Sequence, residues 1–95
     1  MAAVGVLTLE LSIEDAHSLK DKRHVVESLK NKLRNKFNVA VAEIDHQDVW
    51  QRATIAAVTV SSDHVYAEKV LAAVEREAAA LLGRALAEAA VEWLE

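Results

Sequence analysis

The sequence predicts an α+β fold with the element order β-α-β-β-α-β, and three observations lead to this prediction. Hydrophobic or small residues alternate with a period of two in the segments 4–13 and 39–44, and the segment 52–61 is rich in β-branched residues, and both features are typical of strands. Hydrophobic residues recur every three or four positions in the segments 19–36 and 64–82, which is typical of amphipathic helices. Serine and aspartate residues that can cap a helix precede both helical segments.

The first half of the chain predicts a strand followed by a helix. Leucine or isoleucine fills every second position from Leu7 to Ile13. Ser18 then stands at the N-cap position of the helix over 19–36, and Asp21 three residues later forms a short capping box with it. The apolar residues of this helix form one stripe, which predicts that a single face packs on the sheet; they are Leu19, Val26, Leu29, Leu33 and Phe37.

The second half predicts a hairpin and a second helix. The polar residues 45–48 separate the strand over 39–44 from the β-branched segment 52–61, so these two strands are expected to pair. The second helix is expected over 64–82, with Gly83 as its C-terminal stop.

The C-terminal segment 84–95 fits two structures. Alanine, valine and tryptophan alternate as in a strand, whereas the content of alanine, leucine and glutamate favours a helix. We choose the strand, because Gly83 ends the preceding helix and a three-stranded sheet would leave one side unfilled. Tyr66 and Trp93 are expected in the core.

This order of elements is that of the ferredoxin-like two-layer sandwich, a four-stranded antiparallel sheet with two helices on one face. Residues 1–95 are expected to form one such domain, because this length supplies a single core. Both alternating sets are apolar or small in the strands over 39–44 and 52–61, so the uncovered sheet face is expected to form a homodimer. An ordinary surface with scattered small residues is the alternative.

The composition excludes several kinds of chemistry. The chain has no cysteine, so it forms no disulfide and has no thiolate nucleophile or ligand. Its two glycines, Gly5 and Gly83, are too few for a glycine-rich phosphate loop or a nucleophile elbow. The residues indicate no cofactor and no enzyme activity. The absence of a signal peptide and of a long apolar stretch predicts a cytoplasmic protein without a membrane partner.

Positive charge is concentrated in the first helix. Seven of the eleven lysine and arginine residues lie between positions 18 and 37, against two carboxylates, which gives this segment +5 and leaves −9 for the rest of a chain of net charge −4. Such a face can bind a run of phosphates. The residues expected to contact nucleic acid are Lys20, Lys22, Arg23, Lys30 and Arg34. A solvated helix with local pairs, such as Glu27 with Lys30, is the alternative.

The predicted hairpin carries a second group of candidate residues, Glu43, Asp45, Asp48, Trp50 and Arg52. Carboxylates two apart on a strand can share a cation or act as an acid and a base, but this spacing is common. Pairing with the basic helix or with Arg52 is the preferred interpretation, and no metal site is assigned. Trp50 is expected to cap the core or a dimer contact, with a partner anchor as the alternative.

Three stretches resemble the YlxP-like family of small bacterial proteins of unassigned function. They are S-L-K-D-K-R at 18–23, N-K-F-N-V at 35–39 and A-E-I-D-H-Q-D-V-W-Q-R-A at 42–53, and the segments 4–7 and 60–63 fit as well. The resemblance implies a ferredoxin-like fold and a bacterial source, and it provides no catalytic residues. Genes of such proteins often lie beside genes for translation initiation and ribosome maturation factors.

These observations predict a non-catalytic binding protein, an accessory factor in ribosome maturation or translation that contacts ribosomal RNA or a ribosomal subunit through helix 19–36. A homodimeric protein-interaction module that uses the open sheet face, with no nucleic-acid role, is the alternative. In either case the motifs at 18–23 and 42–53 are expected to face each other and to fix the helix against the hairpin.

Overall fold

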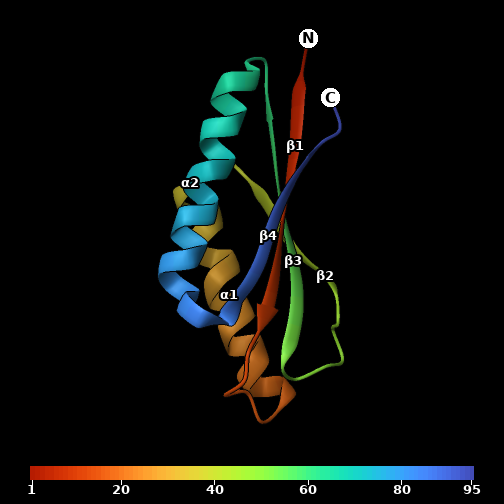
Figure 1. The fold of residues 1–95 in the computed structure, drawn as a ribbon, viewed down its shortest axis with the longest axis vertical. Coiled ribbons are helices and arrows are strands. Elements are labelled where there is room, and N and C mark those ends of the chain that lie inside the picture. Colours follow the sequence, from red (N-terminus) through yellow and green to blue (C-terminus); the bar gives the residue numbers. More distant parts are fainter.

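A computed structural model describes residues 1–95 and has the predicted βαββαβ order (Figure 1). The elements are β1 (Ala3–Ser12), α1 (Leu19–Lys36), β2 (Ala40–Asp45), β3 (Arg52–Ser61), α2 (His64–Leu82), a 3₁₀ turn (Gly83–Ala85) and β4 (Leu86–Trp93). The strands form one antiparallel sheet in the order β2-β3-β1-β4, and both helices cover the same face (Figure 1). The α+β, ferredoxin-like prediction is therefore confirmed.

The core lies between the helices and the two central strands. Leu7, Leu9 and Leu11 of β1 are buried toward the helices, as is Ile55 of β3, which pairs with Leu9. Each helix contributes one buried stripe, which α2 builds from Ala67, Leu71, Val74 and Ala78. The small alanines let this helix approach the sheet closely.

The predicted bounds of both helices and of β3 agree with the structure, and those of β1 and β2 differ by one residue at each end. The C-terminal segment is the expected strand rather than a helix. Gly83 ends α2 with a φ of 55°, in the region that favours glycine, and the chain can therefore turn back along β1.

Gly5 of β1 makes room for Trp93, the tryptophan that β4 places beside it. A Cβ atom at Gly5 would lie 2.6 Å from the Trp93 ring and 2.7 Å from Leu71 Cδ1. The missing side chain therefore makes room for Trp93 between the sheet and α2. Trp93 packs against the core as predicted, and its ring centroid lies 4.1 Å from that of His64.

Two aromatic residues lie outside the core. The prediction for Tyr66 is wrong, because it is 59% exposed on the first turn of α2 while its neighbour Ala67 is buried. Trp50 does not cap the core either, because it is 51% exposed in the loop between β2 and β3. Neither helix is both long enough and apolar enough to cross a membrane.

Candidate functional site

The motif at 18–23 begins α1 with a reciprocal cap. The backbone N–H of Asp21 donates to Ser18 Oγ at 3.1 Å, and the backbone N–H of His17 donates to Asp21 Oδ2 at 3.0 Å. The Ser18 half of the predicted capping box is present, while Asp21 reaches one residue further back, to the N–H of His17 rather than that of Ser18. Asp21 therefore has a structural role.

Lys22 contradicts the expectation that it contacts phosphate. Lys22 is only 1% exposed, and it lies on the same buried face of α1 as Val26 and Leu29. The Nζ atom lies 2.8 Å from Glu43 Oε2 on β2 and donates a hydrogen bond to the backbone oxygen of His46. A buried ammonium group needs such partners, so Lys22 joins α1 to the hairpin and is closed to a polyanion.

Glu43 lies on the opposite side of this contact. Its side chain is 18% exposed, and its Oε2 atom has no directed hydrogen bond although the Lys22 ammonium is close. The Lys22 ammonium is therefore the group that compensates the charge of this carboxylate. Glu43 pairs with Ile55 in the sheet and so faces the helices, whereas the next position is irregular, with Asp45 opposite Thr54.

The loop 46–51 between β2 and β3 is held by hydrogen bonds to the rest of the molecule. His46 has a φ of 65°, a left-handed conformation that histidine tolerates better than most residues. Its N–H donates to Asp45 Oδ1 at 2.8 Å, and its carbonyl accepts from Val49 N at 3.1 Å as well as from Lys22. These bonds fix the turn directly before Trp50.

Gln51 ties this loop to the connection between β1 and α1. Its Nε2 donates to the carbonyls of Glu14 and Ala16, both at 3.2 Å, and its own carbonyl accepts from Ile13 N at 2.7 Å. The structure thus brings the motifs at 18–23 and 42–53 together through Lys22 and Glu43, and Gln51 ties the hairpin to the connection that precedes α1. Asp48, Trp50 and Arg52 are exposed, and neither Asp48 nor Arg52 forms an ion pair with α1.

The other predicted phosphate contacts line the outward face of α1, and we call Lys20, Arg23, Lys30 and Arg34 the cationic stripe. Lys20, Arg23 and Arg34 are exposed, and Arg34 Nη2 donates to Asn31 Oδ1 at 3.0 Å. Lys30 is half-buried, and its Nζ lies 3.4 Å from Glu27 Oε1, the local pair that the sequence allowed. The stripe with Glu27 therefore has a net charge of +3.

Some basic residues of α1 outside the stripe are paired with carboxylates of the same molecule, which the sequence alone does not indicate. Lys36 Nζ lies 2.6 Å from Glu77 Oε1 of α2, so this cation joins the two helices. With Lys22 and Lys30, three of the seven basic residues of this segment have a carboxylate partner within the molecule. The positive surface is real but smaller than a count of charges predicts.

The open face of the sheet divides into an apolar half and an acidic row. Val4 pairs with Val60 and Val6 pairs with Val58, on the side away from the helices. On the neighbouring strands Ala40 pairs with Val58, whereas Glu92 of β4 pairs with Val6 and places one carboxylate at the edge of this half. Further along, Glu10 lies between Thr54, whose Oγ1 donates to it at 2.6 Å, and Glu88.

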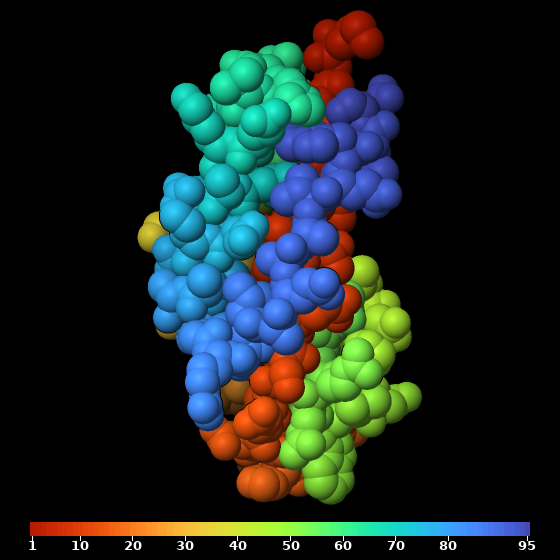
Figure 2. All heavy atoms as spheres, in the orientation of Figure 1, coloured from red at the N-terminus to blue at the C-terminus, as the bar shows by residue number.

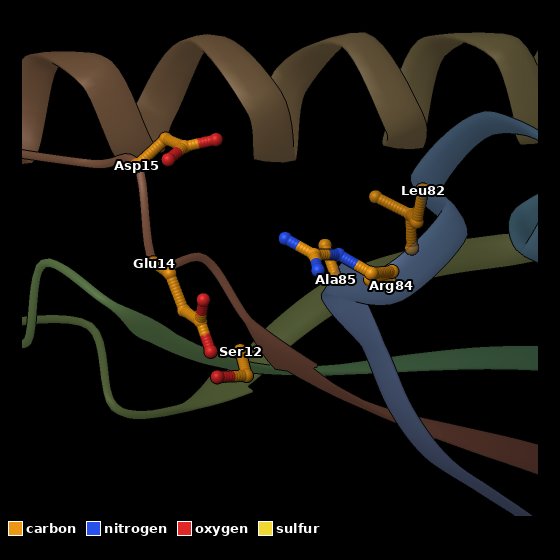
Figure 3. Close-up of a pocket in the computed structure, with 6 residues that line it drawn as sticks. All are labelled: Ser12, Glu14, Asp15, Leu82, Arg84 and Ala85. Atoms are coloured by element: carbon orange, nitrogen blue, oxygen red, sulfur yellow. The ribbon is translucent and has the colours of Figure 1, made fainter.

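One cavity of about 320 Å³ opens between the β1–α1 connection and the end of α2 (Figure 3). Arg84 directs its guanidinium into it from one side, and Glu14 and Asp15 lie on the other (Figure 3). These opposite charges form no ion pair, and Ser12, Leu82 and Ala85 complete the lining. No group of three or more histidine or acidic side chains is arranged to hold a metal ion.

Comparison with known proteins shows a family and a fold. A family model described as "Protein of unknown function (DUF503)" matches residues 4–90. The uncharacterized protein YlxP of Bacillus subtilis is 44% identical over 68 residues, which cover 72% of this chain and 74% of that protein. The likeness to the YlxP-like family is thereby confirmed.

Two solved structures share the fold at low sequence identity. The de novo designed protein Foldit4 has a TM-score of 0.61 and 14% identity, covering 100% of this chain and 98% of that one. A dimeric ferredoxin-like protein of unknown function from Thermobifida fusca has a TM-score of 0.50 and 14% identity, covering 96% and 90%. These two likenesses concern the fold alone.

Proposed function

This chain belongs to DUF503, a family described as proteins of unknown function, and we propose that it is a non-catalytic protein that binds structured RNA through the cationic stripe of α1. The observation that supports the proposal is the stripe itself. Three exposed cations, Lys20, Arg23 and Arg34, have no carboxylate partner and share the outward face of one helix.

The length and the charge of the stripe suit a phosphate backbone. From Lys20 to Arg34 the helix rises about 21 Å at 1.5 Å per residue, which spans several phosphates of one strand. Contacts of this kind position a protein on RNA without reading its sequence. The remainder of the chain is acidic, so an approaching polyanion is steered to this one surface.

The ribosomal part of the proposal rests on the gene neighbourhood that the family resemblance implies. We propose ribosomal RNA, or a ribosomal subunit, as the partner, with a role in ribosome maturation or translation. Such a role would be performed in the cytoplasm.

Charge reversal tests the proposal directly. The variant Arg23→Glu/Arg34→Glu is expected to lose co-sedimentation with purified ribosomal subunits at low salt. The control is Lys69→Glu/Arg76→Glu, which makes the same charge change at exposed positions of α2 and is expected to bind as the wild type does. Equal binding of the wild type and the Arg23/Arg34 variant would reject the proposal.

A second candidate function is self-association through the open sheet face, and the valine pairs of its apolar half support it. The face measures about 19 Å across four strands and about 33 Å along them, or roughly 600 Å² per copy. Two such faces would bury roughly 1,200 Å², at the lower end of specific interfaces, so a weak dimer is expected.

Light scattering over a range of concentrations tests the dimer. Mass should rise toward twice the 10.4 kDa of the chain, and Val58→Lys should keep the protein monomeric. Lys69→Glu on α2 serves as a surface control. A monomer at every concentration would remove the sheet face as a self-association surface and leave the RNA proposal untouched.

A further inference from the structure

The loop 46–51 presents apolar side chains to solvent at one end of the molecule. Trp50 is 51% exposed and Val49 is 42% exposed. The loop lies at the same end as the β1–α1 connection (Figure 1), and the segment around it stands out from the body in the space-filling view (Figure 2). Exposing a tryptophan costs hydrophobic free energy, so its position outside the core needs a reason.

The loop is fixed from two sides. Lys22 holds its first residue through the His46 carbonyl, and Gln51 holds its last residue against the carbonyls of Glu14 and Ala16. Lys22 also pairs with Glu43, which lies on β2 two residues before the strand ends. Trp50 is therefore presented by an ordered loop, and a partner would lose little conformational entropy in binding it.

The surroundings of Trp50 are acidic. Within residues 44–52, Asp45 and Asp48 outnumber the single cation Arg52. Glu14 and Asp15 lie on the connection to which Gln51 is bonded, and Arg84 faces them, so the net charge around the loop is −2 when Lys22 and Glu43 cancel. Such a rim attracts a cationic surface and repels phosphates.

We propose that the loop 46–51 is a docking element for a basic protein, whose apolar socket receives Trp50 and whose lysine or arginine residues meet Asp48 and its acidic neighbours. Tryptophan in an ordered, central position is the residue type that most often dominates a protein interface. A second copy would bring the same carboxylates face to face in a symmetric contact, and an RNA strand would meet the acidic rim.

Selection of peptides tests the docking element without a known partner. A displayed library of random 12-residue peptides is panned on the wild-type protein and depleted on Trp50→Ala. We expect enriched peptides to combine an aliphatic or aromatic residue with at least two lysines or arginines. Enrichment of acidic peptides, or no enrichment over the depleted control, would overturn the proposal.

The peptide with the strongest enrichment is then used to measure a binding affinity and to locate the binding site on the protein. It should shift the indole N–H signal of Trp50 in a ¹H–¹⁵N spectrum and leave that of Trp93 in place. Trp50→Ala should weaken binding at least about 30-fold, as expected for a central anchor, and Asp48→Lys should weaken it about 5-fold. Tyr66→Ala, which removes an equally exposed aromatic ring on α2, should change nothing.

Three further outcomes would contradict the proposal. Binding retained by a folded Trp50→Ala protein would exclude Trp50 as the anchor, and circular dichroism checks that the variant is folded. A Trp50 signal that shifts with protein concentration alone would indicate a second copy. A Trp50 signal that shifts with an RNA oligonucleotide would indicate a nucleic-acid site. The variant Arg23→Glu/Arg34→Glu should keep peptide binding, so this test is independent of the RNA proposal.

Discussion

On the inward face of α1, Lys22 is almost completely buried and its ammonium group contacts Glu43 and the His46 carbonyl, whereas on the outward face Lys20 and Arg23 extend into solvent without an acidic partner. The three residues lie within one turn of the same helix. The comparison teaches that position on the helix, rather than residue type, decides whether a cation stabilises the fold or remains available to a partner.

The largest expected effect comes from breaking the inward face. Lys22→Met should lower the free energy of unfolding by about 2–4 kcal/mol, because it leaves the Glu43 carboxylate partly buried without its cation. Urea denaturation followed by circular dichroism measures the change.

A double variant separates the ion pair from general packing. Lys22→Met/Glu43→Leu should recover at least about 1 kcal/mol of the loss, because no unpaired charge remains at the contact. If Lys22→Met altered stability by less than about 0.5 kcal/mol, the buried contact would not stabilise the fold as the comparison requires.

An intermediate effect is expected at the start of the helix. Ser18→Ala should destabilise the protein by about 1 kcal/mol, because the N–H of Asp21 loses its acceptor. For a protein of this size the thermal midpoint should fall by about 4–8 °C. Ser62→Ala, at an exposed position whose side chain accepts no cap bond, is the matched control and should leave the midpoint unchanged.

The smallest effect on stability is expected on the outward face. Arg23→Ala/Arg34→Ala should change the free energy of unfolding by no more than about 0.5 kcal/mol, because neither side chain has an ionic partner. The same denaturation experiment applies. A loss as large as that of Lys22→Met would mean that both faces serve the fold.

Much of the fold follows from patterns that the sequence displays openly. The helical spacing of Val26, Leu29 and Leu33, together with the cap at Ser18, determines where α1 lies and which face it buries. The strand at the C-terminus could also be chosen correctly, because Gly83 ends the helix before it. Local spacing and capping are properties of neighbouring residues, so they can be read without tertiary structure.

The candidate surfaces were less predictable, because they depend on contacts between distant segments. A count of charges assigns Lys22 to phosphate binding, although it precedes Val26, Leu29 and Leu33 by 4, 7 and 11 positions and so belongs to the buried stripe. The exposure of Trp50 depends on how Lys22 and Gln51 hold its loop, and no local pattern carries that information. The burial of Tyr66 was predicted wrongly because its position in the sequence fits the helical spacing of the apolar side of α2.

The salt dependence of RNA binding tests the role of the outward face most directly. The affinity of the wild-type protein for ribosomal RNA, measured over a series of salt concentrations, should fall with a log–log slope of about −2 to −3, since up to four cations displace counterions. For Arg23→Ala/Arg34→Ala the magnitude of the slope should fall by about half, because two of the four cations are removed. An unchanged slope in this variant would contradict the account, because phosphates would then be bound elsewhere.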